Sequence, residues 1–164
     1  IIDKGSQHGI AAGQAVVDEL GVVGQVVRVF PLTAEVSLLT DKDQAIPVRI
    51  QRNGLRAVLA GAGSGAMELR FLAANAEVQQ GDVLETSGLD GIYLPGLPVA
   101  TVGKIDRDNS YAFARIACEP IAGVERHGLV LVLGSRPTLP DPPPETAGAK
   151  EKPAKGERVR KRIR

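Results

Sequence analysis

Large apolar residues along this chain alternate with polar ones in short runs, and turn-forming residues separate the runs. The clearest example is MELRFLA over residues 67–73, where Met, Leu and Phe alternate with Glu and Arg. This two-residue period is typical of a β-strand with one buried face, because successive side chains of a strand point to opposite faces of the sheet. Helical periodicity is almost absent, and only residues 9–14 and 121–127 are candidates for short helices. The pattern therefore predicts an all-β protein.

Glycine-containing and proline-containing pairs indicate where the strands end. Asn53-Gly54 is a strong signal for a tight hairpin between two strands, and Pro95-Gly96 marks a turn in a glycine-rich stretch. The apolar runs recur at roughly 8–12 residues, a spacing typical of β-sandwiches and small barrels. The expected strands are residues 16–17, 21–30, 34–40, 45–51, 55–61, 67–73, 83–88, 97–106, 111–120 and 128–134.

We expect these strands to form two small β-barrel domains, followed by a disordered C-terminal tail. The first domain is predicted at residues 1–52 and the second at residues 53–123. The final apolar run needs cover on both of its faces, which an interior position in the first domain would supply. The sequence leaves open whether this last strand, within residues 124–134, returns to the first domain.

Residues 135–164 differ from the rest of the chain in composition and charge. They are rich in Pro, then in Lys and Arg, and contain too few large apolar side chains to offset the entropy of ordering. They carry 9 basic and 4 acidic side chains, whereas residues 1–134 carry 11 basic and 15 acidic ones. The body therefore has no basic patch of the kind that binds nucleic acid. The tail is either a solvated extension or a site for anionic lipid headgroups or another polyanion.

Ser87 is the one candidate nucleophile that the turn-rich region offers. The nucleophile elbow of serine hydrolases requires glycine two residues before and two residues after the serine, but Glu85 and Leu89 occupy those positions. A general base could come only from His8 or His127. We therefore interpret Ser87 as a turn residue, with a trypsin-like hydrolase that uses Ser87 and one of these histidines as the alternative.

Metal and cofactor sites have no support in the residue spacing. Two histidines and the single Cys118 are widely separated and match no zinc-binding pattern. The glycine-rich segment at residues 61–66 lacks the Lys of a phosphate-binding loop. Cys118 lies in an alternating run and is expected to be a buried, unreactive thiol. We therefore predict no catalytic, metal or cofactor site.

The order of motifs resembles that of the MreC family of bacterial rod shape-determining proteins. The most specific stretch is GDVLETSGLDGIYLPGLPVATVGKI, and the others are DKGSQHGIAAGQAVV, GVVGQVVRV, VSLLTD and GLVLVL, all in the family's order. The chain departs from the family pattern at His8 and at Ala100, which affects local turns only. The resemblance covers most of residues 1–134 and says nothing about the tail.

The resemblance implies a non-enzymatic scaffold of cell-wall elongation on the periplasmic side of the bacterial inner membrane. The partners it implies are the elongation-specific class B penicillin-binding protein, MreD, RodA and MreB, together with self-association. Members of the family have one transmembrane helix and a coiled coil before their two barrels, and we expect these helices to lie outside this sequence. Membrane contact is then expected only through that helix, or through the basic tail.

Aromatic residues are rare in this chain, so few side chains can serve as aromatic anchors at an interface. The candidate anchors are Tyr93, Phe71, Tyr111 and Phe113. Of these, we expect Phe71 and Phe113 to be ordinary core residues rather than anchors. Tyr93 lies between turn signals. Together with Leu94, it is the predicted partner-binding site.

Overall fold

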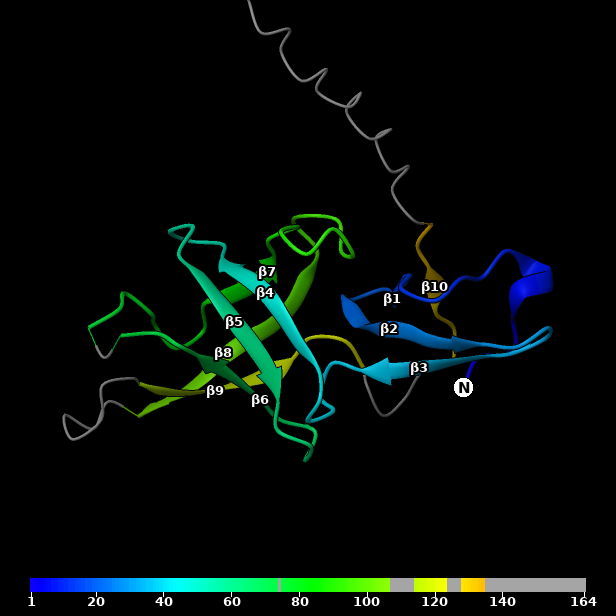
Figure 1. The fold of residues 1–164 in the computed structure, drawn as a ribbon. Helices are drawn as coiled ribbons and strands as arrows, with labels where there is room; N and C mark the ends of the chain where they lie inside the picture. The colour runs from blue at the N-terminus through cyan, green and yellow to red at the C-terminus, as the bar shows by residue number, and fades with distance from the viewer. Residues whose placement is uncertain (74, 107–113, 124–127, 135–164) are drawn as a thin grey trace, which may run out of the picture.

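The computed structural model describes residues 1–73, 75–106, 114–123 and 128–134, and it confirms the all-β prediction within them. Ten strands are present, and the described residues contain no helix beyond a single turn of 3-10 helix, η1 (Ser6–His8). Figure 1 shows a barrel beside a smaller sheet. No helix in the described part of the chain is long and apolar enough to cross a membrane. The predicted tail lies outside the described residues.

The smaller unit is a four-stranded antiparallel sheet, which we call the first sheet. Its strand order is β10-β1-β2-β3. The chain therefore returns to this sheet after completing the barrel, because β10 pairs with β1. The strands are β1 (Ala15–Val17), β2 (Val22–Val29), β3 (Ala34–Leu38) and β10 (Leu131–Val132).

The larger unit is a closed six-stranded barrel in the order β4-β5-β6-β9-β8-β7. Antiparallel pairing of β4 with β7 closes it, so that no barrel strand has an unpaired edge. The strands are β4 (Ala45–Ile50), β5 (Arg56–Gly61), β6 (Met67–Arg70), β7 (Val83–Thr86), β8 (Pro98–Asp106) and β9 (Arg115–Pro120).

Strand β4 corrects the predicted domain boundary at residue 52. It pairs with β5 and β7 and so belongs to the barrel. The predicted hairpin at Asn53-Gly54 is present, with Gly54 at a φ of 73°, and the Ile50 N–H donates to the Leu55 carbonyl at 2.8 Å. The hairpin joins two strands of one barrel rather than beginning a new domain. The change of sheet falls between β3 and β4.

The candidate helix at residues 9–14 is also absent. That segment is a pair of turns, in which Gly9 and Gly13 have φ values of 80° and 87°. A right-handed helix requires negative φ, so these two glycines end any helix that starts at η1. The other candidate, residues 121–127, lies partly outside the described residues, and 121–123 are not helical.

Both faces of the first sheet carry apolar side chains, and one of them packs on the barrel. Ala15 and Val17 belong to the same buried cluster as the barrel core, whereas Val16 between them belongs to a second cluster. The two units also meet through the backbone, because a Cβ added at Gly21 would lie 2.5 Å from the Pro98 carbonyl oxygen. Burial of each large aliphatic side chain at this junction contributes about 1.5–3 kcal/mol, so the sheet and the barrel support each other.

Candidate protein-interaction surface

The loop at residues 87–97 connects β7 to β8, and Thr86 holds its two ends together. The Thr86 side chain is fully buried. Its hydroxyl donates to the Leu94 carbonyl and accepts from the Leu97 N–H at 2.9 Å. The Thr86 backbone N–H also donates to the Leu97 carbonyl, and the Gly96 N–H donates to the Thr86 carbonyl, both at 2.9 Å. Four hydrogen bonds to one residue therefore fix the shape of this β7–β8 loop.

An aspartate turn and glycines with positive φ build the middle of the loop. Asp90 Oδ1 accepts hydrogen bonds from the N–H groups of Ile92 at 3.0 Å and Tyr93 at 3.2 Å. Gly91 has a φ of 70°, which L-residues adopt only with strain. This is the turn chemistry that the sequence indicated for this stretch. Within this turn Ile92 and Leu94 are exposed, whereas Tyr93 between them is buried.

Tyr93 points inward, which corrects its expected place at the surface. Only 5% of Tyr93 is exposed, and its ring packs in the core cluster shared by the barrel and the first sheet. Burial raises the pKa of the phenol, and its hydroxyl has no hydrogen-bond partner among the described residues. The sequence suggested exposure because turn residues surround Tyr93, but the turn at Asp90 folds the ring back into the core.

Three apolar side chains near Tyr93 in the β7–β8 loop are exposed, and we call this set the knuckle. It consists of Leu89, Ile92 and Leu94, which are 62%, 39% and 43% exposed. Leu94 was predicted as an interface residue and is at the surface. Leu89 and Ile92 were not predicted as interface residues. The sequence did contain a signal for Ile92, because alternation places Ile92 and Leu94 on one side of the chain and Tyr93 on the other. Exposed apolar side chains on a rigid loop are suited to a protein partner.

Ser87 is tied to the barrel rather than presented to a substrate. Its hydroxyl donates to the Pro47 carbonyl at 3.0 Å, and its N–H donates to the same oxygen at 3.1 Å. His8 lies in η1, where its Nδ1 accepts from the Gly5 N–H at 3.2 Å. His127 lies outside the described residues. The described part of the chain therefore pairs Ser87 with a backbone carbonyl and shows no bond from Ser87 to His8.

Cys118 is buried, as the alternation in its sequence indicated. Desolvation raises the pKa of its thiol to about 12, so almost none of it is thiolate at neutral pH. Its sulfur lies 3.8 Å from the Ile116 carbonyl oxygen. Within the described residues no group of three His, Cys, Asp or Glu side chains is arranged to hold a metal ion.

The buried carboxylate of Asp82 has a structural role. Arg52 donates to both of its oxygens, from Nε at 2.8 Å and from a terminal nitrogen at 3.0 Å. The Gln79 N–H adds a third bond at 2.9 Å. The hydrogen bonds from Arg52 lower the pKa of Asp82 in spite of its burial. This pair fixes the β4–β5 hairpin to the segment before β7.

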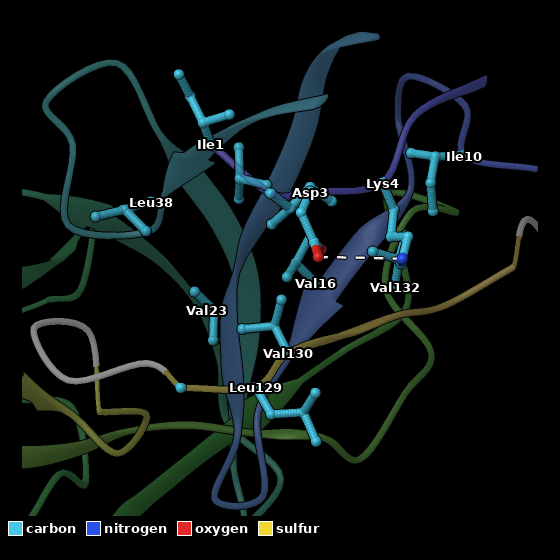
Figure 2. Close-up of a pocket in the computed structure, with 13 residues that line it drawn as sticks. Ile1, Asp3, Lys4, Ile10, Val16, Val23, Leu38, Leu129, Val130 and Val132 are labelled. Carbon is cyan, nitrogen blue, oxygen red and sulfur yellow. Dashed lines mark ion pairs between the residues drawn. The ribbon is translucent and has the colours of Figure 1, made fainter. Parts of the chain in front are cut away.

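A groove of about 620 Å³ lies on the face of the first sheet that carries Val16. Figure 2 shows aliphatic side chains lining it, together with Asp3 and Lys4, whose charged groups form an ion pair at 4.0 Å. The lining comes from the strands of the sheet, from the segment near residue 1 and from residues 128–130. Such a lining can hold apolar side chains, and its described residues include no histidine, cysteine or serine.

The aromatic candidates are distributed differently from the prediction. Phe71 was expected in the core, but it is 73% exposed. Tyr111 and Phe113 lie outside the described residues. Phe30, which was not singled out, is half-exposed in the β2–β3 hairpin beside the exposed Leu32.

Comparison with known proteins gives a consistent assignment. Residues 1–134 match the family model described as rod shape-determining protein MreC, barrel core. The cell shape-determining protein MreC of Escherichia coli is 40% identical over 148 residues, which are 86% of this chain and 40% of that protein. The chain thus spans about two fifths of the length of this curated relative.

Solved structures agree with the sequence comparison. A crystal structure of MreC from Pseudomonas aeruginosa superposes with a TM-score of 0.79 at 44% identity, covering 81% of this chain and 86% of that one. A complex between a penicillin-binding protein and MreC from Helicobacter pylori gives a TM-score of 0.55 at 27% identity, covering 66% of each chain. The family match, the identity and the shared fold all agree, and the chain belongs to the MreC family of rod shape-determining proteins.

Proposed function

We propose that this protein is a non-enzymatic scaffold of cell-wall elongation on the periplasmic side of the bacterial inner membrane. It maintains rod shape by binding and organising peptidoglycan synthases. The observation that carries the proposal is the similarity to an MreC chain that was solved in complex with a penicillin-binding protein. The proposed partner here is the elongation-specific class B penicillin-binding protein.

The knuckle is the proposed docking surface for this partner. Its leucine and isoleucine side chains are exposed by between 39% and 62%, while the loop beneath them is fixed by Thr86 and Asp90. A surface that is already ordered loses little conformational entropy when it binds. Tyr93 supports this surface from inside the core, and Leu94 contacts the partner.

The test measures binding of the chain to the transpeptidase domain of the partner by calorimetry or interferometry. Leu94→Asp places a charge in the proposed contact and should weaken binding at least tenfold. Leu32→Asp is the control, because Leu32 is another exposed leucine, at 60% against 43% for Leu94, and it lies in the β2–β3 hairpin of the first sheet. This variant should leave affinity unchanged. Deletion of residues 135–164 should also leave affinity unchanged.

Two results would contradict the proposal. Absence of saturable binding by the unmodified chain would reject the penicillin-binding protein as its partner. Equal affinities of the unmodified chain and Leu94→Asp would reject the knuckle as the contact surface. Circular dichroism of each variant ensures that a loss of binding is not a loss of fold.

Association with MreD, RodA, MreB and a second copy of the chain completes the proposed role. These contacts are expected of a scaffold that gathers several proteins at one membrane site. Co-purification of the longer protein from membranes, with and without the knuckle substitution, would show which of them depend on this surface. Sedimentation analysis of the chain alone would measure its self-association.

A further inference from the structure

Exposed arginines lie on the outer surface of the barrel, one on each of four neighbouring strands. The strands β4, β5, β6 and β9 are consecutive in the closed barrel (Figure 1). On each strand, a residue adjacent to the arginine belongs to the barrel core or packs against it, so alternation directs the arginine outward. We call this set the arginine row, and it consists of Arg49, Arg56, Arg70 and Arg115.

The pairing of the strands brings these arginines close together. Arg49 on β4 and Arg56 on β5 are direct cross-strand partners. The next pair of strands matches Val58 with Arg70, which makes Arg70 a diagonal neighbour of Arg56, and residues in diagonal positions are about 7–8 Å apart. Strand β6 ends at Arg70 where its antiparallel partner β9 begins at Arg115. The row therefore concentrates positive charge on a body in which acidic residues outnumber basic ones.

Acidic residues accompany the two ends of the row. Glu85 on β7 forms an ion pair with Arg49 at one end. At the other end, Asp106 on β8 is the cross-strand partner of Arg115. Each terminal arginine thus has a carboxylate of this chain on the neighbouring strand.

The two middle arginines, Arg56 and Arg70, differ from the ends in this respect. Neither forms an ion pair or a side-chain hydrogen bond within the part of the chain that the structure describes. Glu68 shares the outer face of β6 with Arg70, but no ion pair joins them. Like charges opposite each other in a sheet are destabilising. A negatively charged ligand between the two guanidinium groups would remove this repulsion.

The spacing of Arg56 and Arg70 indicates the kind of anion that fits. A guanidinium group binds a carboxylate through two parallel hydrogen bonds. In an extended peptide, alternate side chains lie on the same face about 7 Å apart, which is close to the separation of diagonal neighbours in a sheet. Val58, on the same outer face, is half-buried and offers apolar contact beside them. An extended segment with carboxylates at alternate positions therefore matches the two arginines.

A lipid surface fits the row less well than a peptide does. Sites for anionic lipids usually cluster about 4–8 basic side chains, whereas Glu85 and Asp106 flank this row at its ends. The 15 acidic side chains of residues 1–134, against 11 basic ones, would also oppose the approach of a broad anionic surface. A narrow acidic segment can contact the middle of the row without meeting these carboxylates.

We propose that Arg56 and Arg70 bind an acidic, extended segment of a partner protein. The site lies on strands β5 and β6 and shares no residue with the knuckle. It does not depend on the identity of the partner that binds the knuckle, and so it goes beyond the proposed function.

The experiment measures binding of the whole chain to a short synthetic peptide in which Glu alternates with Thr. Nuclear magnetic resonance of the labelled chain should show shifts in β5 and β6, and a peptide with Gln in place of Glu should not produce them. Combining Arg56→Gln with Arg70→Gln should weaken binding at least fivefold. The matched control combines Arg28→Gln with Lys42→Gln, which changes the net charge equally at exposed residues outside the row, and it should leave affinity unchanged.

Thermal unfolding adds a second readout. Arg56→Gln removes one of two like charges that face each other across β4 and β5, so its unfolding midpoint should stay the same or rise. A lower midpoint would show that the barrel itself is stabilised by this guanidinium, and it would overturn the proposal.

Three binding results would also overturn the proposal. In the first, the double variant of the row binds the peptide as tightly as the unmodified chain. In the second, the control variant loses as much affinity as the row variant, which would make net charge the cause. In the third, the row variant loses binding to vesicles of phosphatidylglycerol and phosphatidylcholine but keeps its affinity for the peptide, which would assign the row to lipid headgroups.

Discussion

The buried hydroxyl of Tyr93 gives a sharp test of the packing beneath the knuckle. Tyr93 is 5% exposed, and its hydroxyl has no hydrogen-bond partner among the described residues. A buried polar group that lacks a partner costs about 1–3 kcal/mol, because it gives up its hydrogen bonds to water. Phenylalanine has the same ring without the hydroxyl. Tyr93→Phe should therefore leave the free energy of unfolding unchanged or raise it by about 1–2 kcal/mol.

Removing the whole ring should have the opposite effect. Tyr93→Ala leaves a cavity in the core cluster that the barrel shares with the first sheet, and such truncations of large aromatic residues cost about 3–5 kcal/mol. The knuckle would also lose its support, so affinity for the partner should fall even though Tyr93 does not touch it. In Tyr93→Phe the knuckle keeps its support, and affinity should be unchanged.

Urea unfolding followed by circular dichroism measures both variants. A shift of the midpoint at a constant slope reports a change in stability rather than in the unfolded state. If Tyr93→Phe destabilised the fold by more than about 1 kcal/mol, the hydroxyl would have to be hydrogen-bonded in solution, and the reasoning from its burial would be refuted.

Two further predictions concern the ion pair at the β4–β5 hairpin and the junction of the two units. Arg52 lowers the pKa of Asp82 in the folded chain. The stabilisation that the ionised Asp82 carboxylate gives the fold is therefore present at neutral pH, and it is lost as pH falls through the folded pKa. Urea unfolding should show Asp82→Asn to be less stable than the unmodified chain at pH 7. The difference between their free energies of unfolding should narrow below about pH 4, and a difference independent of pH would contradict the prediction. Gly21→Ala places Cβ 2.5 Å from the Pro98 carbonyl oxygen and should cost about 1–3 kcal/mol by overpacking. Gly128→Ala, which meets nothing within 4 Å, is its control, and equal stability of the two variants would rule out the close contact.

Local sequence was sufficient for the class of fold and for most strands. Alternation over residues 67–73 predicted β6, and Asn53-Gly54 predicted the hairpin between β4 and β5. These features depend on neighbours in the chain, namely the orientation of successive side chains in a strand and the φ values that a turn requires. The burial of Cys118 followed from the same alternation.

Local sequence predicted only part of the candidate site, because it does not determine the direction of side chains at turns. The sequence located the turn-rich stretch and Leu94, which lies at the surface. It gave the wrong direction for Tyr93 and for Phe71, because both residues lie where the chain turns. At a turn the two-residue period is interrupted, so alternation no longer indicates which side chain faces the core.

The sequence by itself determined an all-β chain with its turns in the right places, because strand alternation and turn propensity are local properties. Only the tertiary structure decided that β4 belongs to the barrel, that β10 pairs with β1, and that Tyr93 is buried while Phe71 is exposed. Each of these depends on pairing or packing between segments distant in the chain. The free energy of such contacts comes from hydrogen bonds and buried area that exist only once the barrel closes and the first sheet packs against it.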